Sequence, residues 1–160
     1  VKGKGVLVLG AGGAARTAAA WAVSAGAEVR IANRTRDRAE RLAADLRDKG
    51  EGTGSVAVAD WADRDRVASE IVIHATSIGM STGGAPGGSP MSEQALRTGR
   101  PLVFETVYSP RVTPLVAAAR DAGCAVIDGL EMFVAQAAAQ SEMWVGQRPS
   151  MEECRRWIDQ

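Results

Sequence analysis

A glycine-rich turn between an apolar run and an alanine-rich segment constrains this chain more than any other feature of its sequence. Residues 6–9 (VLVL) form a continuous apolar run, which is typical of a strand buried on both faces of a parallel sheet. Residues 10–15 (GAGGAA) follow it, and residues 14–24 are rich in the helix former alanine and end shortly before Gly26. A strand, a glycine turn and a helix in this order predict the first unit of a nucleotide-binding α/β sheet.

The alternation of short apolar runs and longer helical patterns continues to the end of the chain. The further expected strands are residues 28–32, 55–59, 71–73, 102–104 and 125–127. The further expected helices are residues 37–47, a short one at 63–69, one that begins at Thr113-Pro114, a long one at 130–145, and a last one that begins with the capping pair Ser150 and Glu153. This order predicts an α/β fold, a doubly wound, mostly parallel, Rossmann-type three-layer sandwich in a single domain. We expect that domain to span residues 1–146, with residues 147–160 forming a C-terminal helix.

Composition and charge exclude several other classes of protein. The 160 residues are enough for one domain, and 19 Lys and Arg balance 19 Asp and Glu, whereas nucleic-acid or anionic-membrane surfaces need an excess of positive charge. No apolar run approaches the roughly 18 residues of a membrane span. The single histidine, His74, excludes a multi-histidine metal site, and Cys124 and Cys154 are too few for a disulfide scaffold. We therefore expect a reducing, cytoplasmic setting and no bound metal. Because the chain opens on Val1, we also expect it to be a piece of a longer protein.

The glycine turn has the spacing G-x-G-x-x-A of dinucleotide-binding loops. Gly10 would make the tight turn, Gly12 would let a pyrophosphate approach the backbone, and Ala15 would let the helix pack closely on the sheet. The amino end of the helix would supply free N–H groups to the phosphates. The alternative is a glycine turn that binds no ligand.

The end of the second expected strand indicates which dinucleotide fits. An NAD site usually places an Asp or Glu there, but Glu28 lies at the start of this strand and the neutral Asn33 follows its end. Arg34 and Arg38, four residues apart, carry planar cationic groups suited to a phosphate. The 2′-phosphate of NADP is therefore the better fit. The alternative is a solvated, arginine-rich helix face that pairs with neighbouring carboxylates.

Several motifs taken together resemble one known family, the shikimate dehydrogenases, in its nucleotide domain. They are residues 10–15 (GAGGAA), 33–38 (NRTRDR), 75–80 (ATSIGM), 107–110 (VYSP) with Thr113, and 129–136 (GLEMFVAQ). These motifs occur in the family's order and cover nearly the whole chain. Phe133 looks closer to the forms that are fused to dehydroquinate dehydratase than to the single-function enzymes.

The resemblance implies a set of site residues. The cofactor's pyrophosphate would lie on Gly10, Ala11, Gly12, Gly13 and Ala14, and its 2′-phosphate end on Asn33, Arg34, Thr35 and Arg38. The nicotinamide and its ribose would border Thr76, Ser77, Thr106, Gly129 and Met132. The substrate, shikimate or 3-dehydroshikimate, would be reached by Tyr108 and Gln136. This sequence departs from the family at His74, where Asn is usual, and at Glu105 and Thr106, which replace Asp and a common apolar residue.

The residues alone leave alternatives open at three of these positions. Tyr108 follows a strand end, where open α/β sheets bind ligands, or it is simply a packed tyrosine. Gln136 shares a helix face with Met132, away from an expected buried stripe that includes Phe133, or it is a surface amide. His74 also follows a strand end, where it is either a structural turn histidine or a general acid.

A catalytic base is missing from the sequence. Hydride transfer from an alcohol needs a group that takes the hydroxyl proton, and the family carries a Lys and Asp pair for this on a separate substrate domain. The lysines of this chain, Lys2, Lys4 and Lys49, all lie away from the expected nicotinamide. We therefore expect no catalytic residue in this chain, and an absent amino-terminal domain against which residues 147–160 would pack.

The leading hypothesis is the NADP-binding part of a shikimate dehydrogenase, which reduces 3-dehydroshikimate reversibly with NADPH. A second hypothesis is an NAD-preferring quinate or shikimate dehydrogenase. A third, from another class, is a non-catalytic NADP-sensing domain. A glutamyl-tRNA reductase nucleotide domain shares the early motifs but is not expected to carry residues 108–110 or 129–132.

Overall fold

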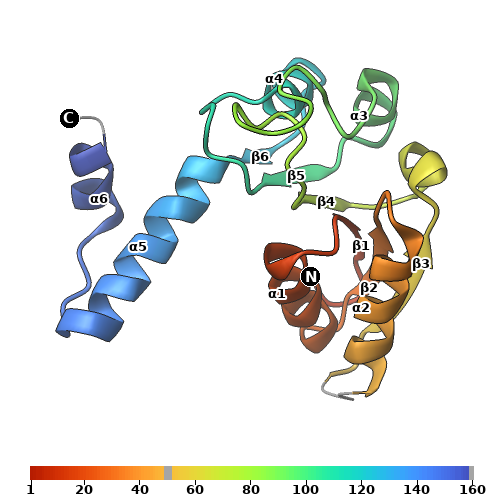
Figure 1. Ribbon diagram of the computed structural model, residues 1–160, viewed down its shortest axis with the longest axis horizontal. Coiled ribbons are helices and arrows are strands. Elements are labelled where there is room, and N and C mark those ends of the chain that lie inside the picture. The colour runs from red at the N-terminus through yellow and green to blue at the C-terminus, as the bar shows by residue number, and fades with distance from the viewer. Residues whose placement is uncertain (49–51, 159–160) are drawn as a thin grey trace.

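A six-stranded parallel sheet with helices on both faces forms the body of the protein (Figure 1). The computed structural model describes residues 1–48 and 52–158, and within them the strands are β1 (Gly5–Leu9), β2 (Glu28–Ala32), β3 (Ser55–Ala59), β4 (Ile71–His74), β5 (Leu102–Glu105) and β6 (Val126–Ile127). The helices are α1 (Gly13–Ser24), α2 (Arg36–Asp48), a 3-10 helix η1 (Trp61–Arg66), α3 (Glu93–Gly99), α4 (Pro114–Asp121), α5 (Gly129–Val145) and α6 (Met151–Ile158). The strand order β3-β2-β1-β4-β5-β6, parallel throughout, is the doubly wound order and confirms the predicted fold class.

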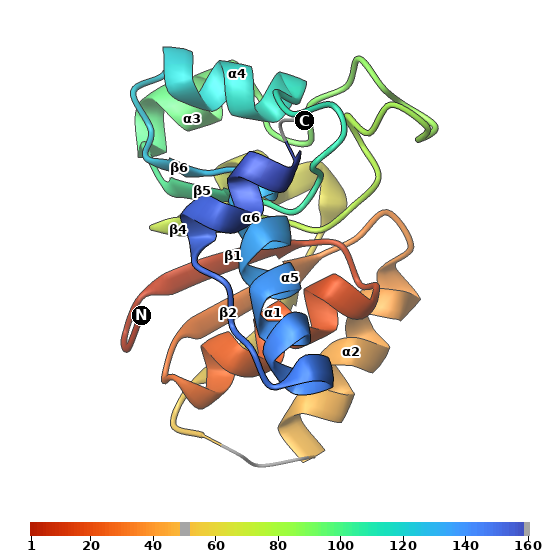
Figure 2. The same cartoon turned by 90° about the vertical axis from the view of Figure 1, so that its left-hand side faces the viewer.

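Strand β1 supplies side chains to two separate cores because successive residues of a strand point to opposite faces. Val6 and Val8 pack with α1 and α2, while Leu7 and Leu9 pack with α3 and α4. All four are at most 2% exposed, which explains why residues 6–9 are apolar without a polar alternation. Figures 1 and 2 show the resulting division, with α1 and α2 beside β1–β3 and with α3 and α4 beside β4–β6.

Helix ends follow the predicted local signals. After α1 the chain turns at Gly26, whose φ of 83° lies in the region that favours glycine. Thr113 caps α4 by accepting a hydrogen bond from the Val116 N–H, and proline follows it at the first turn. Ser150 accepts from the Glu153 N–H while the Glu153 carboxylate accepts from Ser150 N–H, which is the predicted capping box.

Helices α5 and α6 form a pair of their own beyond the last strand. Figure 1 shows α5 leaving the sheet at β6 and α6 turning back beside it. Leu130, Val134 and Ala138 of α5 enclose Cys154 of α6 in a small buried cluster. The far end of the pair is apolar and exposed, with Met143 78% and Trp144 73% exposed.

The structure differs from the sequence predictions in several elements. Helix α3 was not predicted, because its seven residues bury only Leu96 and so carry no helical periodicity. The short helix expected at 63–69 is η1, at Trp61–Arg66. Residues 50–55 (GEGTGS) have the glycine-rich composition of a turn, and their start, like Lys49, lies outside the described residues.

The expected buried stripe of α5 was wrong at Phe133. Its side chain is 37% exposed, and its ring lies 4.9 Å from the ring of Tyr108, centroid to centroid. Trp21 and Trp157 are also exposed, by 59% and 64%.

Candidate functional site

The predicted site residues lie along the carboxyl edge of the sheet, on both sides of the point where the strand order reverses. Strands β1 and β4 are neighbours there, with Leu9 opposite His74, and the connections from their ends run to opposite faces of the sheet. In open α/β sheets, ligands bind in the crevice outside the strand ends at such a point, so we take this edge as the candidate cofactor crevice.

Two glycines of the first loop have different structural roles. Gly10 has a φ of 120°, and a Cβ atom at this position would lie 2.4 Å from the Ala75 carbonyl oxygen. The fold itself therefore requires glycine at this position. Gly12 has an ordinary φ of −88°, and a Cβ there would meet no described atom within 4 Å. The fold does not need glycine at position 12, so the open space beside it fits a ligand phosphate that approaches the backbone closely.

The amino end of α1 is suited to an anion. Gly12 is its N-cap, and among the described residues no side chain caps it and no acidic residue stands in its first turn. Its first N–H groups and the positive end of its dipole therefore face the open space beside Gly12. Ala15 is fully buried against the sheet, which brings the helix close, as predicted.

The end of β2 carries two exposed guanidinium groups. Asn33 donates from its side-chain nitrogen to the Thr35 carbonyl at 2.8 Å and so shapes the turn into α2. Arg34 and Arg38 are exposed, and within residues 1–48 and 52–158 neither makes an ion pair. Arg36, in contrast, binds the carboxylates of Glu40 and Asp60. The local turn thus leaves two of the three cations available to an anionic ligand.

Electrostatics around Arg36 agree with this division. Its hydrogen bonds to Glu40 and then Asp60 raise the pKa of the guanidinium above its ordinary value, so it stays charged and paired. Glu28, the carboxylate that an NAD site would need at the other end of the strand, is exposed at the start of β2. Directly after β2 come Asn33 and Arg34, so within the described residues no carboxylate immediately follows the end of this strand.

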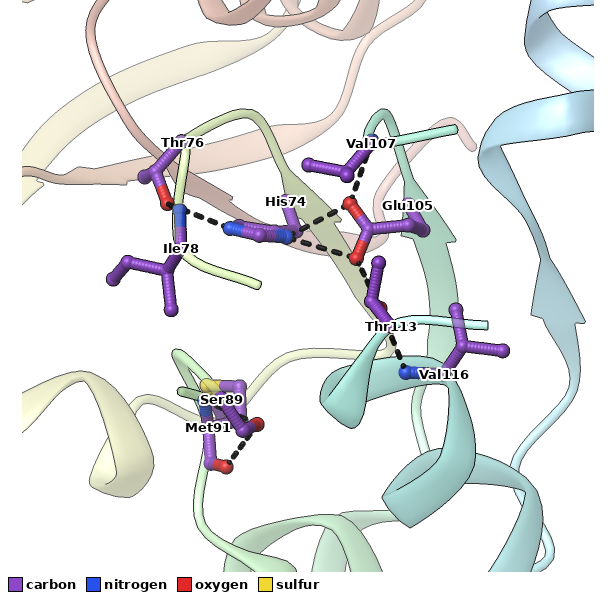
Figure 3. A network of polar contacts seen from close by, with 9 residues as sticks. All are labelled: His74, Thr76, Ile78, Ser89, Met91, Glu105, Val107, Thr113 and Val116. Carbon is purple, nitrogen blue, oxygen red and sulfur yellow. Dashed lines mark hydrogen bonds and ion pairs between the residues drawn. The ribbon is translucent and has the colours of Figure 1, made fainter. Parts of the chain in front are cut away.

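A buried polar network holds the neighbouring strand ends (Figure 3). His74 ends β4 and Glu105 ends β5, the two are register partners, and both are fully buried. The His74 Nδ1 lies 2.8 Å and 3.0 Å from the two carboxylate oxygens of Glu105, and its Nε2 lies 2.6 Å from the Thr76 hydroxyl. The Val107 N–H and the Thr113 hydroxyl also donate to Glu105, at 2.9 Å and 2.8 Å.

Residues predicted to border the nicotinamide and the substrate come from loops and from α5. Thr76 and Thr106 are half-buried and Ser77 is exposed, and the Thr106 N–H donates to the His74 carbonyl at 3.1 Å. Gly129 begins α5, and a Cβ there would lie 2.0 Å from the Val107 carbonyl oxygen. Met132 is half-buried one turn later.

Tyr108 and Gln136, the two predicted substrate residues, are both exposed. Tyr108 is 53% exposed and stacks at a tilt of 30° on Phe133. Gln136 lies one helical turn after Met132. The sequence singled out Tyr108 but missed Phe133 as its partner, and it noted Glu105 only as a departure from the family. The signal for Glu105 was a lone carboxylate at the end of an otherwise apolar strand.

No other part of the chain that the structure describes offers a comparable arrangement. A cavity of about 500 Å³ lies by the amino ends of β4 and β5, lined in part by Ser69 and Pro101, and none of the predicted site residues lines it. Burial raises the pKa of the Cys124 thiol, which makes it a poor nucleophile. Within the described residues, His, Cys, Asp and Glu form no group that could hold a metal ion, and no helix is long and apolar enough to cross a membrane.

Comparison with known proteins decides the family. The sequence profile described as shikimate / quinate 5-dehydrogenase matches residues 1–132, and that of the shikimate 5′-dehydrogenase C-terminal domain matches residues 129–156. This chain belongs to the shikimate/quinate 5-dehydrogenase family. The NADP⁺ shikimate dehydrogenase of Paracoccus denitrificans is 43% identical to it over 91% of the chain and 49% of the relative. That of Methanocella arvoryzae is 40% identical over 98% of the chain and 56% of the relative.

Solved structures of family members superpose closely on this one. The quinate dehydrogenase of Corynebacterium glutamicum in complex with NAD gives a TM-score of 0.86 at 27% identity, and covers 100% of this chain and 56% of its own. A shikimate dehydrogenase in complex with NADP⁺ gives 0.82 at 29% identity, over 98% of this chain and 54% of its own. The chain thus spans about half the length of the relatives it matches.

Proposed function

We propose that this chain is the NADP-binding domain of a shikimate dehydrogenase, an oxidoreductase that reduces 3-dehydroshikimate reversibly to shikimate with NADPH. The observation that carries the proposal is the pairing of an open, uncapped helix end at Gly12 with two exposed guanidinium groups, Arg34 and Arg38, at the end of β2. The first suits a pyrophosphate and the second a further phosphate on the adenosine ribose. The names of the 40–43% identical relatives support NADP.

Each group of residues has a binding role in this proposal. Gly10, Ala11, Gly12, Gly13 and Ala14 hold the pyrophosphate, and Asn33 and Thr35 shape the turn that presents Arg34 and Arg38. Thr76, Ser77, Thr106, Gly129 and Met132 border the nicotinamide end, and Tyr108 with Gln136 reaches toward the substrate. The cofactor supplies the hydride, and the chain determines where it is delivered.

The base that moves the hydroxyl proton is proposed to lie outside this chain, as a Lys and Asp pair on an amino-terminal substrate domain. The chain covers about half of its relatives, and the described lysines, Lys2 and Lys4, precede β1. We propose that residues 1–146 form the nucleotide domain and that residues 147–160 contact the substrate domain. The exposed Trp144 and Trp157 support this, because large exposed apolar patches usually mark contact surfaces.

A cytoplasmic location follows from the same proposal. Cys124 and Cys154 are both free and both buried, as is usual for thiols kept in a reducing compartment.

An NAD-preferring quinate or shikimate dehydrogenase is the second candidate. The NAD complex of the Corynebacterium glutamicum quinate dehydrogenase, at a TM-score of 0.86, is the observation in its favour. The position of Glu28 at the amino end of β2 opposes it, since Asn33 and Arg34 directly follow that strand, where an NAD site usually places an Asp or Glu for the ribose 2′-hydroxyl. A non-catalytic NADP-sensing domain has no observation of its own to favour it.

A calorimetric titration with NADP⁺ and NAD⁺ side by side tests the proposal. We expect NADP⁺ to bind at least tenfold more tightly, a difference of about 1.4 kcal/mol. Equal or tighter binding of NAD⁺ would favour the quinate-type candidate. A second test follows shikimate oxidation by this chain alone, where we expect no turnover. Substantial turnover would show that the catalytic base lies within the chain.

A further inference from the structure

His74 and Glu105 lie at a central, buried position of the sheet, where packing alone does not require a polar or charged side chain. They end adjacent strands, lie opposite each other in the register, and are 0% exposed. Burial of a charged or polar pair is costly unless every group is hydrogen-bonded, so a pair in this position needs a compensating network. Figure 3 shows that network reaching into the two loops that follow the strands.

The hydrogen bonds can be assigned donor by donor. Glu105 accepts from the Val107 N–H and from the Thr113 hydroxyl, so the remaining contact needs a donor, and His74 Nδ1–H supplies it. When the imidazole is neutral, the Thr76 hydroxyl donates to Nε2, and its oxygen accepts from the Ile78 N–H at 3.2 Å. One unbroken chain of hydrogen bonds therefore joins the loop after β4 to the loop after β5.

Each end of this hydrogen-bond network lies against an element of the candidate cofactor crevice. On one side, a Cβ on Gly10 would meet the Ala75 carbonyl oxygen at 2.4 Å and the Thr76 Cγ2 at 3.3 Å, so the glycine loop packs directly on Ala75 and Thr76. On the other, Gly129 at the start of α5 packs directly on the Val107 carbonyl. The network therefore extends from the glycine loop to the start of α5.

We infer that His74 and Glu105 are positioning residues, a buried bridge that holds the Thr76 loop and the Val107–Tyr108 loop together as one surface for the nicotinamide end of the cofactor. The inference rests on the proposed function, because it names what fixes the nicotinamide half of that site. It assigns no role to these two residues in binding the adenosine half, which lies on Arg34 and Arg38 across β1 and β2.

Two substitutions cut the bridge at different places. His74→Asn keeps an amide donor near the position of Nδ1 and so keeps the bond to Glu105, but it loses the link to Thr76. His74→Gln reaches toward Thr76 and loses the Nδ1 bond to Glu105. Asn is the usual residue of the family at this position, so His74→Asn, which keeps the bond between the two strand ends, should bind NADP⁺ as the wild type does. His74→Gln breaks that bond and should lose affinity.

The readout compares NADP⁺ with adenosine 2′,5′-bisphosphate, which carries the adenosine phosphates but no nicotinamide. We expect His74→Gln to bind NADP⁺ about tenfold more weakly, and His74→Asn to bind it within about twofold of the wild type. Both variants should bind adenosine 2′,5′-bisphosphate within about twofold of the wild type. Hydrogen exchange of the Val107 amide should accelerate in His74→Gln. Cys124→Ala serves as the control, since it removes a buried side chain bonded to the Leu96 carbonyl, away from the crevice, and should change neither affinity.

Three outcomes would overturn the inference. Wild-type affinity of His74→Gln for NADP⁺ would show that the bond between His74 and Glu105 does not position the nicotinamide surface. Equal weakening of both nucleotides would show a general structural role instead of positioning. A wild-type chain that binds neither nucleotide would overturn the proposed function and this inference with it, whereas wild-type binding with unchanged variants overturns the inference alone.

Discussion

The two halves of the sheet present different surfaces at the same edge. At the ends of β1 and β2 the edge is open: an uncapped helix end beside Gly12, and the exposed side chains of Arg34 and Arg38. At the ends of β4 and β5 it is closed by His74 and Glu105, which are fully buried and bonded to each other. The first half leaves its positive groups available to a ligand, while the second uses its polar groups to hold its own loops. A dinucleotide that lies across both would meet exposed positive groups in the first half and a buried, hydrogen-bonded pair in the second.

The largest expected effect separates two glycines of the open half. Gly10→Ala should destabilise the fold by about 3 kcal/mol, because its φ of 120° strains any L side chain and the new Cβ meets the Ala75 carbonyl. Gly12→Ser should leave the free energy of unfolding nearly unchanged, since serine is a good N-cap residue and has room there. It should nevertheless abolish NADP⁺ binding. Urea unfolding and calorimetry measure the two quantities.

Of these two glycine variants, Gly12→Ser is the one that tests the pyrophosphate site. If it binds NADP⁺ as the wild type does, the space beside the helix end does not hold the pyrophosphate, and the open half loses its assigned role.

The next effect lies in the closed half. Thr113→Val should destabilise the chain by about 2 kcal/mol, because it removes both the cap of α4 and one donor to the buried Glu105 carboxylate. Thr113→Ser keeps the hydroxyl and should unfold close to the wild type in urea. Equal destabilisation by the two variants would mean that the methyl group, and not the hydroxyl, matters at this position.

A smaller effect concerns ligand selectivity in the open half. Arg34→Ala and Arg38→Ala should each weaken NADP⁺ about tenfold, or about 1.4 kcal/mol, and leave NAD⁺ unchanged, since NAD⁺ lacks the 2′-phosphate. Arg36→Ala is the matched control: its guanidinium is already bound to Glu40 and Asp60, so NADP⁺ affinity should not change. Competitive titration measures all three. A loss confined to Arg36→Ala would reverse the assignment of these cations.

The smallest effect is a pH dependence at the amino edge of the sheet. Hydrogen bonds from the Lys4 side chain and then the Gly5 N–H hold the pKa of Glu70 below its usual range. A lowered folded-state pKa means that this contribution is fully present above the unfolded value, about 4.3, and is lost as the pH falls through the folded value. The unfolding midpoints of the wild type and Glu70→Gln should therefore differ at pH 7 and converge in acid.

Glu93→Gln is the comparison for this measurement, because Glu93 makes a longer ion pair, 3.8 Å, with Arg97. If Glu93→Gln shows the same pH-dependent difference, the effect reports net charge and not the bond to Lys4.

The two halves of the sheet also differed in how well the sequence predicted their structure. The strands and helices of the open half were predicted nearly to the residue, because a buried parallel strand and an amphipathic helix each have a characteristic pattern. Helix α3 was missed, since it buries Leu96 alone and gains its stability from contacts with α4 and the sheet. Phe133 was wrongly placed in the core, because helical periodicity shows which residues share a face and not what that face contacts. Here the contact is the ring of Tyr108, which lies in the loop after β5.

The sequence by itself determined the fold class, the glycine turn and the positions of the arginines, because these depend on residues close together in the chain. Tertiary structure alone decided which groups were already engaged. It paired Arg36 with Asp60 and left Arg34 exposed, and it showed that Gly10 is required by the fold while Gly12 is not. It also brought His74 and Glu105, 31 residues apart, into one buried bridge. Such pairings depend on strand register, which is set by the packing of the whole sheet and not by any local pattern.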